Sequence, residues 1–169
     1  SCSKILMRIV SDREEKHGKL FMEACVTQAL LSTCQRARCG SVIVSNGGII
    51  GAGFNSPPGN KESQRKCVCR KEDYNQKITD KTCCIHAEQR AIIDALKKNH
   101  RKIKNSQIYF SRIDENDKLI FSGKPYCTIC SKLALDVGIA EFVLWHEQGI
   151  TVYSTEEYNE ISYQFKEYL

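Results

Sequence analysis

The 169-residue chain contains no apolar run that approaches the ~20 residues needed to cross a membrane. Residues 1–10 lack both a long apolar stretch and a small-residue cleavage site, so we recognise no secretory signal there. Internal repeats and low-complexity tracts are also absent. Hydrophobic residues make up 41% and charged residues 27% of the chain, which is typical of globular proteins. We therefore expect one compact domain over residues 1–169, in the cytoplasm and without membrane association.

The ten cysteines would suit a secreted disulfide-rich protein, but their positions favour reduced thiols. Cys25 and Cys34 lie within apolar helical patterns, and Cys127 and Cys130 have the spacing of metal ligands. Most of the remaining thiols are then expected to serve as small buried hydrophobic residues. This cysteine usage agrees with a cytoplasmic protein.

Positive charge is concentrated in the middle of the chain. Residues 55–105 carry thirteen basic and six acidic side chains, whereas residues 106–169 carry five and ten. A positive segment favours an anionic ligand such as a nucleotide or a nucleic acid, although an ordinary solvated surface explains the same charges equally well. The acidic last third, with no basic aromatic-rich stretch, argues against an extended nucleic-acid groove.

Hydrophobic periodicity and turn signals predict four helices and five strands. The helices are expected over residues 11–34, 86–98, 127–137 and from 154 onward. The strands are expected over residues 41–45, 48–55, 107–112, 141–145 and 150–153. Asn46 and Gly47 predict a hairpin turn between the first two strands. Residues 56–83 have no clear period and form a long cysteine-containing loop, and residues 113–124 form a charged loop.

Each of the four predicted helices carries a pattern that defines one face, which in the third helix consists of Ile129, Leu133 and Val137. The first helix places four residues on one face: Leu20, Ala24, Thr27 and Leu31. The second has a stripe of small residues that allows close approach to a sheet: Ala87, Ala91 and Ala95. The last directs four residues inward: Tyr158, Ile161, Phe165 and Tyr168.

The order of the elements predicts the fold class. Strand–helix–strand crossovers imply parallel pairing with helices packed on the faces of the sheet. We therefore expect an α/β fold, a three-layer α/β/α sandwich with a mixed sheet of about five strands.

His86-Ala87-Glu88 and the later Cys127-Thr128-Ile129-Cys130 carry the chemistry of the chain. Each motif falls at the start of a predicted helix, where free N–H groups and the helix dipole favour thiolates. His86, Cys127 and Cys130 offer three ligands for Zn²⁺, and a catalytic zinc site uses three protein ligands and leaves the fourth position for water. A structural zinc site would need four.

Glu88 lies two residues from His86 and need not bind the metal. There it can accept a proton from water and pass it on, while zinc lowers the pKa of water to about 7. A lone Cys-x-x-Cys is weak evidence, but the combination of both motifs at helix starts favours a catalytic zinc site.

These motifs resemble the cytidine deaminase superfamily, whose signature is His-x-Glu followed by Pro-Cys-x-x-Cys. The segment over residues 51–59 further resembles the deoxycytidylate deaminases, and the element order of residues 15–155 fits the fold of the superfamily. The resemblance implies zinc-dependent hydrolytic deamination of a cytosine-type nucleoside or nucleotide, and a homo-oligomer. It also implies that Asn55 contacts the sugar and that the backbone amides of Ala87 and Cys127 help to hold the base.

Two positions depart from the pattern of the family. Tyr126 stands between Pro125 and Cys127, where the family has the proline directly before the cysteine. Arg90 stands where deoxycytidylate deaminases often have asparagine, and we expect it to have a surface or packing role rather than to reach a phosphate.

The long loop suggests a second metal site, at Cys67, Cys69, Cys83 and Cys84, to which Cys34 or Cys39 could contribute. Some deoxycytidylate deaminases hold a structural metal there, and a loop with little apolar content gains stability from one. Free thiols, or a disulfide formed on oxidation, are the alternative.

Two other functions stay open. The chain could be a base deaminase that acts on RNA or DNA, which the basic middle segment favours. It could also be a non-catalytic zinc-stabilised binding module, in which a fourth protein ligand would close the site. Glu88 argues against the binding module, because a structural zinc site has no use for an unligated carboxylate.

Overall fold

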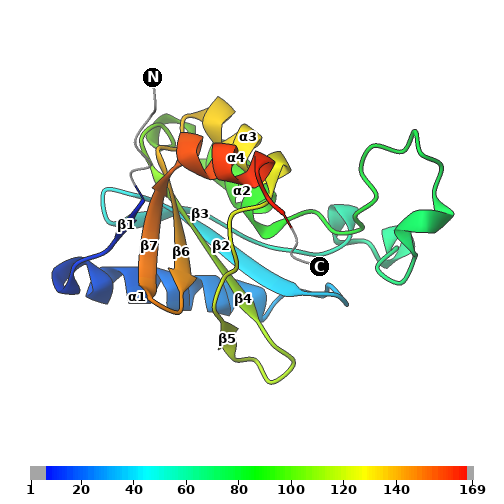
Figure 1. Ribbon diagram of the computed structural model, residues 1–169, viewed down its shortest axis with the longest axis horizontal. Coiled ribbons are helices and arrows are strands. Elements are labelled where there is room, and N and C mark those ends of the chain that lie inside the picture. The colour runs from blue at the N-terminus through cyan, green and yellow to red at the C-terminus, as the bar shows by residue number, and fades with distance from the viewer. Residues whose placement is uncertain (1–6, 167–169) are drawn as a thin grey trace.

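The computed structural model describes residues 7–166, and a mixed β-sheet forms the middle layer of the molecule (Figure 1). Its strands are β1 (Arg8–Ile9), β2 (Arg38–Ser45), β3 (Gly48–Phe54), β4 (Gln107–Ile113), β5 (Leu119–Ile120), β6 (Glu141–His146) and β7 (Gly149–Ser154). The strand order is β1-β7-β6-β4-β2-β3, and β5 pairs with β4. Strands β4 and β6 are parallel, and the other paired strands of the described residues are antiparallel.

Helices cover both faces of the sheet (Figure 1). The helix α1 (Asp12–Ala29) packs on one face, and α2 (Ala87–Asn99), α3 (Thr128–Val137) and α4 (Thr155–Tyr163) pack on the other. Four short 3₁₀ turns complete the described elements: η1 (Pro58–Asn60), η2 (Glu62–Gln64), η3 (Lys71–Asp73) and η4 (His100–Lys102). The predicted three-layer sandwich is confirmed. None of the helices in residues 7–166 is long and apolar enough to cross a bilayer.

The sheet has seven strands rather than the five predicted. The two that the sequence did not indicate, β1 and β5, are each two residues long, too short to show the period-2 alternation of a strand. The predicted hairpin is confirmed, because Asn46 and Gly47 have φ angles of 49° and 77°, the positive values that this turn requires.

Alternation along the strands divides the core into two clusters. On β2, Ile43 faces α2 and α3, whereas Val42 and Val44 face α1. The larger cluster includes Phe142 and Tyr158, whose rings stack with centroids 3.9 Å apart. This cluster lies beneath the helices that carry the His-x-Glu and Cys-x-x-Cys motifs.

The prediction for the face of α1 was wrong. The helix buries Gly18, Met22, Cys25 and Ala29, whereas Leu20 is 56% exposed. A Cβ added at Gly40 of β2 would lie 1.9 Å from the carbonyl oxygen of Cys25, so the backbones approach too closely for large side chains between them. The fully buried face of α1 therefore consists of small residues and Met22. The prediction for α3 was wrong in part, because Ile129 is 41% exposed, whereas Leu133 and Val137 pack against the core.

Both terminal helices are shorter than predicted. Helix α1 ends at Ala29 instead of Cys34, and the hydroxyl of Ser32 then donates to the carbonyl oxygen of Asn55 (2.7 Å), which directs the chain toward the end of β3. Helix α4 ends at Tyr163, so Phe165 lies beyond it and is 42% exposed. Tyr168 lies outside the described residues.

The small-residue stripe of α2 packs directly on two glycines of β3. A Cβ at Gly53 would lie 2.5 Å from the backbone nitrogen of Ala91, and one at Gly51 would lie 2.7 Å from the Cβ of Ala95. Neither neighbour is a flexible side-chain end that could move aside. The prediction that the alanines permit close approach is confirmed, and the glycines complete that contact.

Replacement of Gly53 by alanine should therefore destabilise the protein by about 1–3 kcal/mol, because the helix must move away from the strand. Gly48→Ala is the matched control, since its added Cβ would lie 3.7 Å from the nearest atom. Thermal unfolding should show a lower midpoint for Gly53→Ala and a nearly unchanged one for Gly48→Ala. Equal midpoints would show that the interface can expand.

Candidate metal centre and pocket

The structure brings His86, Cys127 and Cys130 together, although the two motifs are about forty residues apart. His86 is the N-cap of α2, Cys127 is the N-cap of α3, and Cys130 lies in the first turn of α3. The Nδ1 atom of His86 is 3.2 Å from the sulfur of Cys127 and 3.2 Å from that of Cys130. All three candidate ligand atoms lie within 4.8 Å of one another.

This donor set fits zinc. Bonds of about 2.3 Å to sulfur and 2.0 Å to nitrogen in a tetrahedral arrangement place nitrogen and sulfur ligands roughly 3.5 Å apart. The observed separations of 3.2 Å need only a small adjustment. Hydrogen bonds from Cys130 and His86 lower the pKa of the Cys127 thiol to about 5, so a thiolate is available. Within residues 7–166, no fourth His, Cys, Asp or Glu joins this group.

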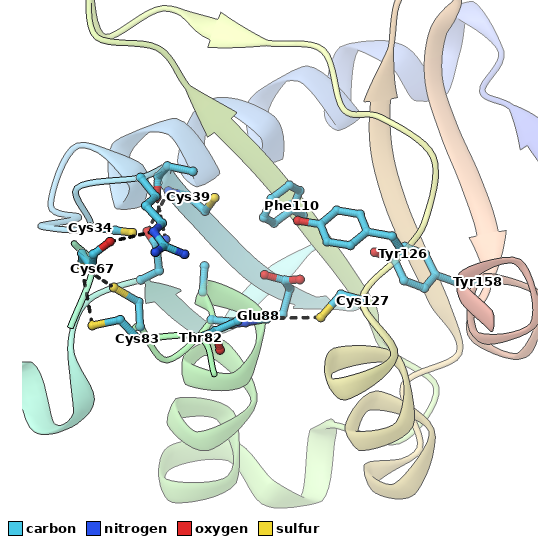
Figure 2. Close-up of a pocket in the computed structure, with 16 residues that line it drawn as sticks. Cys34, Cys39, Cys67, Thr82, Cys83, Glu88, Phe110, Tyr126, Cys127 and Tyr158 are labelled. Carbon is cyan, nitrogen blue, oxygen red and sulfur yellow. Dashed lines mark hydrogen bonds between the residues drawn. The ribbon is translucent and has the colours of Figure 1, made fainter. Parts of the chain in front are cut away.

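Glu88 lies beside the three candidate ligands without belonging to their group. It is 5% exposed, and its carboxylate points into the pocket from the first turn of α2 (Figure 2). Burial raises the pKa of this carboxyl group to about 7, and the charge of Cys127 contributes in the same direction. A buried carboxyl group that can hold or release a proton near neutral pH suits acid–base chemistry.

The pocket has two chemically different ends and a volume of about 230 Å³. Figure 2 shows Phe110, Tyr126 and Tyr158 at one end, near Glu88 and Cys127. The other end is lined by Arg36 and five cysteines: Cys34, Cys39, Cys67, Cys83 and Cys84. All of these cysteines except Cys84 are labelled in Figure 2. The reacting group of a ligand bound beside Glu88 would therefore lie among aromatic rings, and the opposite end of the ligand would lie near the second set of cysteines.

Asn55 lines this pocket, but most of the hydrogen-bonding capacity of its side-chain amide is already taken by protein groups. Its Oδ1 accepts hydrogen bonds from the backbone N–H of Cys39 (2.8 Å) and from Ser32 (2.5 Å), and its Nδ2 donates to the carbonyl of Ala37 (2.7 Å). One N–H of the amide remains for a ligand. Asn55 thus holds the loop that precedes β2 and can offer a single donor to the pocket.

Ala87 and Tyr126 also line the pocket. Ala87 is fully buried at the first position of α2, where its backbone N–H is not used by the helix. The extra residue before Cys127 does not separate the two cysteines from His86. Instead it adds an aromatic ring to the wall, and this ring packs against Phe165 with centroids 5.7 Å apart.

Arg90 connects the helix of Glu88 to the segment that contains Asn55. Its guanidinium donates to the carbonyl oxygens of Phe54 (3.0 Å) and Pro57 (2.9 Å) and to the hydroxyl of Ser56. It also lies over the ring of Phe54, 5.7 Å from the centroid. This packing role agrees with the expectation from the sequence.

A second sulfur group lies at the far end of the pocket. The sulfurs of Cys34, Cys67 and Cys84 lie within 4.8 Å of one another, and the sulfur of Cys83 is 3.5 Å from that of Cys67. Of the four cysteines proposed from the sequence, Cys69 and Cys83 stand outside the group of three that could hold a metal, although Cys83 contacts Cys67. Cys34, which follows α1, completes the group with Cys67 and Cys84.

The family model of the cytidine and deoxycytidylate deaminase zinc-binding region matches residues 15–146. The chain belongs to this family. It is 26% identical over 146 residues to the deoxycytidylate deaminase of Saccharomyces cerevisiae. The matched region covers 81% of this chain and 42% of the yeast protein. The chain spans about two fifths of the length of the curated relatives it matches.

Two solved structures show the same fold. The dCMP deaminase of the cyanophage S-TIM5, in complex with dCMP and dUMP, matches with a TM-score of 0.53 and 20% identity, covering 79% of this chain and 81% of that one. The cytidine deaminase of Burkholderia pseudomallei matches with a TM-score of 0.54 and 18% identity, covering 83% and 94%. The expected cytidine deaminase-like fold is confirmed.

Sequence reasoning did not identify Arg36 and Phe110 as pocket residues. The sequence predicts a strand at Phe110 but not which face its side chain occupies, and Arg36 lies just after the helix predicted over residues 11–34. Arg36 donates to the carbonyls of Cys67 (2.7 Å) and Cys69 (2.6 Å), a contact between distant segments that no local pattern could indicate.

Replacement of Arg90 by methionine should loosen the segment over residues 54–57, because several carbonyl oxygens lose their donor. We expect a loss of about 1–3 kcal/mol in stability and faster amide exchange in this segment. Lys97→Met is the matched control, since Lys97 is exposed on the same helix. Hydrogen-exchange mass spectrometry would report both variants, and protection of residues 54–57 equal to that of the unsubstituted protein in Arg90→Met would contradict the role of Arg90.

Proposed function

We propose that the chain is a zinc-dependent hydrolytic deaminase of a cytosine-type nucleoside or nucleotide. The observation that carries this proposal is a buried carboxylate, Glu88, beside three candidate zinc ligands in a pocket. Three protein ligands suit catalysis, and a structural zinc would not require the carboxylate. The family of the chain and its deoxycytidylate deaminase relatives support the same activity.

His86, Cys127 and Cys130 would hold the zinc ion. When bound, zinc lowers the pKa of water to about 7 and so makes hydroxide available at neutral pH. Glu88 would accept one proton of this water and donate it to the ring nitrogen next to the amino-bearing carbon. It would then carry the second proton of the same water to the leaving amine. Water and the cytosine-type base are then converted to a uracil-type base and ammonia.

The remaining contacts would orient the substrate. The free backbone N–H groups of Ala87 and Cys127 would hold the base at the helix starts, and the spare N–H of Asn55 would contact the sugar. Arg36 at the far end carries a positive charge that suits an anionic substituent. Deoxycytidine monophosphate is thus the first compound to test, since the yeast relative is named for it.

Replacement of Glu88 by glutamine should keep zinc bound but lower ammonia release by at least 10²–10⁴-fold, because the proton carrier is lost. Cys130→Ser should lose both zinc and activity, whereas the exposed Glu156→Gln should retain both. Metal analysis and an ammonia assay over cytosine, adenine and guanine compounds would measure these outcomes. Substantial turnover by Glu88→Gln would remove Glu88 from its role, and failure of every compound with the unsubstituted chain would reject the deaminase.

We also propose that Cys34, Cys67, Cys83 and Cys84 bind a structural zinc ion. The sulfur of Cys67 lies 3.5 Å from that of Cys83 and 3.6 Å from that of Cys84. Tetrahedral Zn–S bonds of about 2.3 Å place sulfur ligands roughly 3.8 Å apart. The sulfurs of Cys34, Cys67 and Cys84, which all lie within 4.8 Å of one another, would form three corners of the site, and Cys83, which contacts Cys67, would move toward the other two to close it. Such a metal would fix the loop that forms the far wall of the pocket.

Elemental analysis should then find two zinc ions per chain in the unsubstituted protein and one in Cys67→Ser. Cys69→Ser should retain two, because within the described residues the sulfur of Cys69 contacts none of these four sulfurs. Cys25→Ser is a further control, since Cys25 is buried on the opposite face of the sheet. A single zinc in the unsubstituted protein, or unchanged content in Cys67→Ser, would reject the second site.

A further inference from the structure

We propose that the hydroxyl of Tyr158 binds the base of the substrate and contributes to base specificity. This inference rests on the proposed function and goes beyond the residues of the His-x-Glu and Cys-x-x-Cys motifs. It assigns a substrate contact to α4, a helix that follows the region matched by the family model.

Tyr158 is a buried polar side chain without a protein partner. The residue is 4% exposed, yet no hydrogen bond reaches its hydroxyl from any residue in the range 7–166. Leaving a buried hydroxyl unpaired is costly, so tyrosine in a core normally finds a partner. Tyr109 and Tyr153, the other buried tyrosines described, do so with Gln107 and His146.

The unpaired hydroxyl is not sealed inside the core. Among the described residues, the one fully buried side-chain oxygen or nitrogen without a partner is Oε2 of Glu157, so the Tyr158 oxygen keeps contact with open space. That space is the pocket, which Tyr158 lines together with Glu88 and Cys127. Figure 2 shows its ring extending from α4 toward the end of the pocket where Glu88 lies.

Packing holds the ring of Tyr158 in place. It stacks on Phe142 with centroids 3.9 Å apart and meets the ring of Tyr153 edge-on at 6.2 Å. Burial raises the pKa of Tyr158 well above its usual value, so the phenol keeps its proton. The hydroxyl of Tyr158 is therefore a hydrogen-bond donor with a fixed position in the pocket.

The chemistry of the base identifies the partner of this donor. A cytosine-type ring has two acceptors, the ring nitrogen next to the amino-bearing carbon and the carbonyl oxygen. Glu88 donates to the ring nitrogen in the proposed reaction, which leaves the carbonyl oxygen, whose two lone pairs can accept from a backbone N–H and from Tyr158 together. Because Tyr158 lies at the Glu88 end of the pocket, the base rather than the sugar is within its reach, and we assign its hydrogen bond to the carbonyl oxygen.

Tyr158→Phe removes only the hydroxyl and keeps the stacked ring. With deoxycytidine monophosphate, or whichever cytosine compound the ammonia assay selects, kcat/KM should fall about two- to tenfold, the range for loss of one neutral hydrogen bond. The change should lie mainly in KM, because the carbonyl oxygen accepts the bond both before and during the reaction. Zinc content and melting temperature should stay the same.

Tyr109→Phe is the matched control, since Tyr109 is buried on the α1 side of the sheet, away from the pocket. A substrate analogue with sulfur in place of the base carbonyl oxygen (the 2-thio analogue) completes a double-mutant cycle with Tyr158→Phe, because sulfur is a poor hydrogen-bond acceptor. The loss caused by Tyr158→Phe should be smaller with the 2-thio analogue than with the oxygen compound. A loss of equal size with both compounds would exclude the carbonyl oxygen as the partner.

The failure of this inference is distinguishable from failure of the deaminase itself. Binding of the same nucleotide to Glu88→Gln, measured by calorimetry, tests the pocket without turnover. If Glu88→Gln binds the nucleotide and Tyr158→Phe has unchanged kcat/KM, the assignment to Tyr158 is overturned while the deaminase stands. If no nucleoside or nucleotide binds or reacts, both are overturned.

Discussion

The contact between α2 and β3 is the constraint on which the candidate site depends. Gly51 and Gly53 have no side chains, so the strand packs directly against the alanine stripe of the helix. This close contact fixes the distance between helix and strand. His86 and Glu88 occupy the first residues at the end of this helix. The location of an imidazole and a carboxylate is thus set by residues that have no functional groups of their own.

The second half of the site comes from α3, whose first turn carries both sulfurs toward the same place. Each helix contributes an N-terminus, so unsatisfied N–H groups and two partial positive charges face the pocket. Arg90 then links α2 to the end of β3, and Asn55 links that end to the segment before β2. Elements distant in sequence are thereby held at one rim of the sheet.

Periodic and short-range features could be predicted from the sequence. The Asn46-Gly47 turn, the alanine stripe and the helix starts at His86 and Cys127 all follow from local rules, and the four residues singled out around the metal are close together in space. Features set by long-range packing could not. The buried face of α1 depends on its close contact with the backbone of Gly40. The participation of Cys34 instead of Cys69 depends on how the long loop folds against the segment that follows α1.

The loop over residues 56–83 differs from the rest of the molecule in what holds it. Arg36 and Arg65 fasten it through backbone carbonyls, its sulfurs face one another, and most of its side chains are exposed. The loop buries little apolar surface, so it contributes little to the free energy of global unfolding. Removal of a metal from these sulfurs would therefore open the far wall of the cavity and leave the sandwich intact, and a calorimetric melt would record the unfolding of the sandwich but not the opening of the wall.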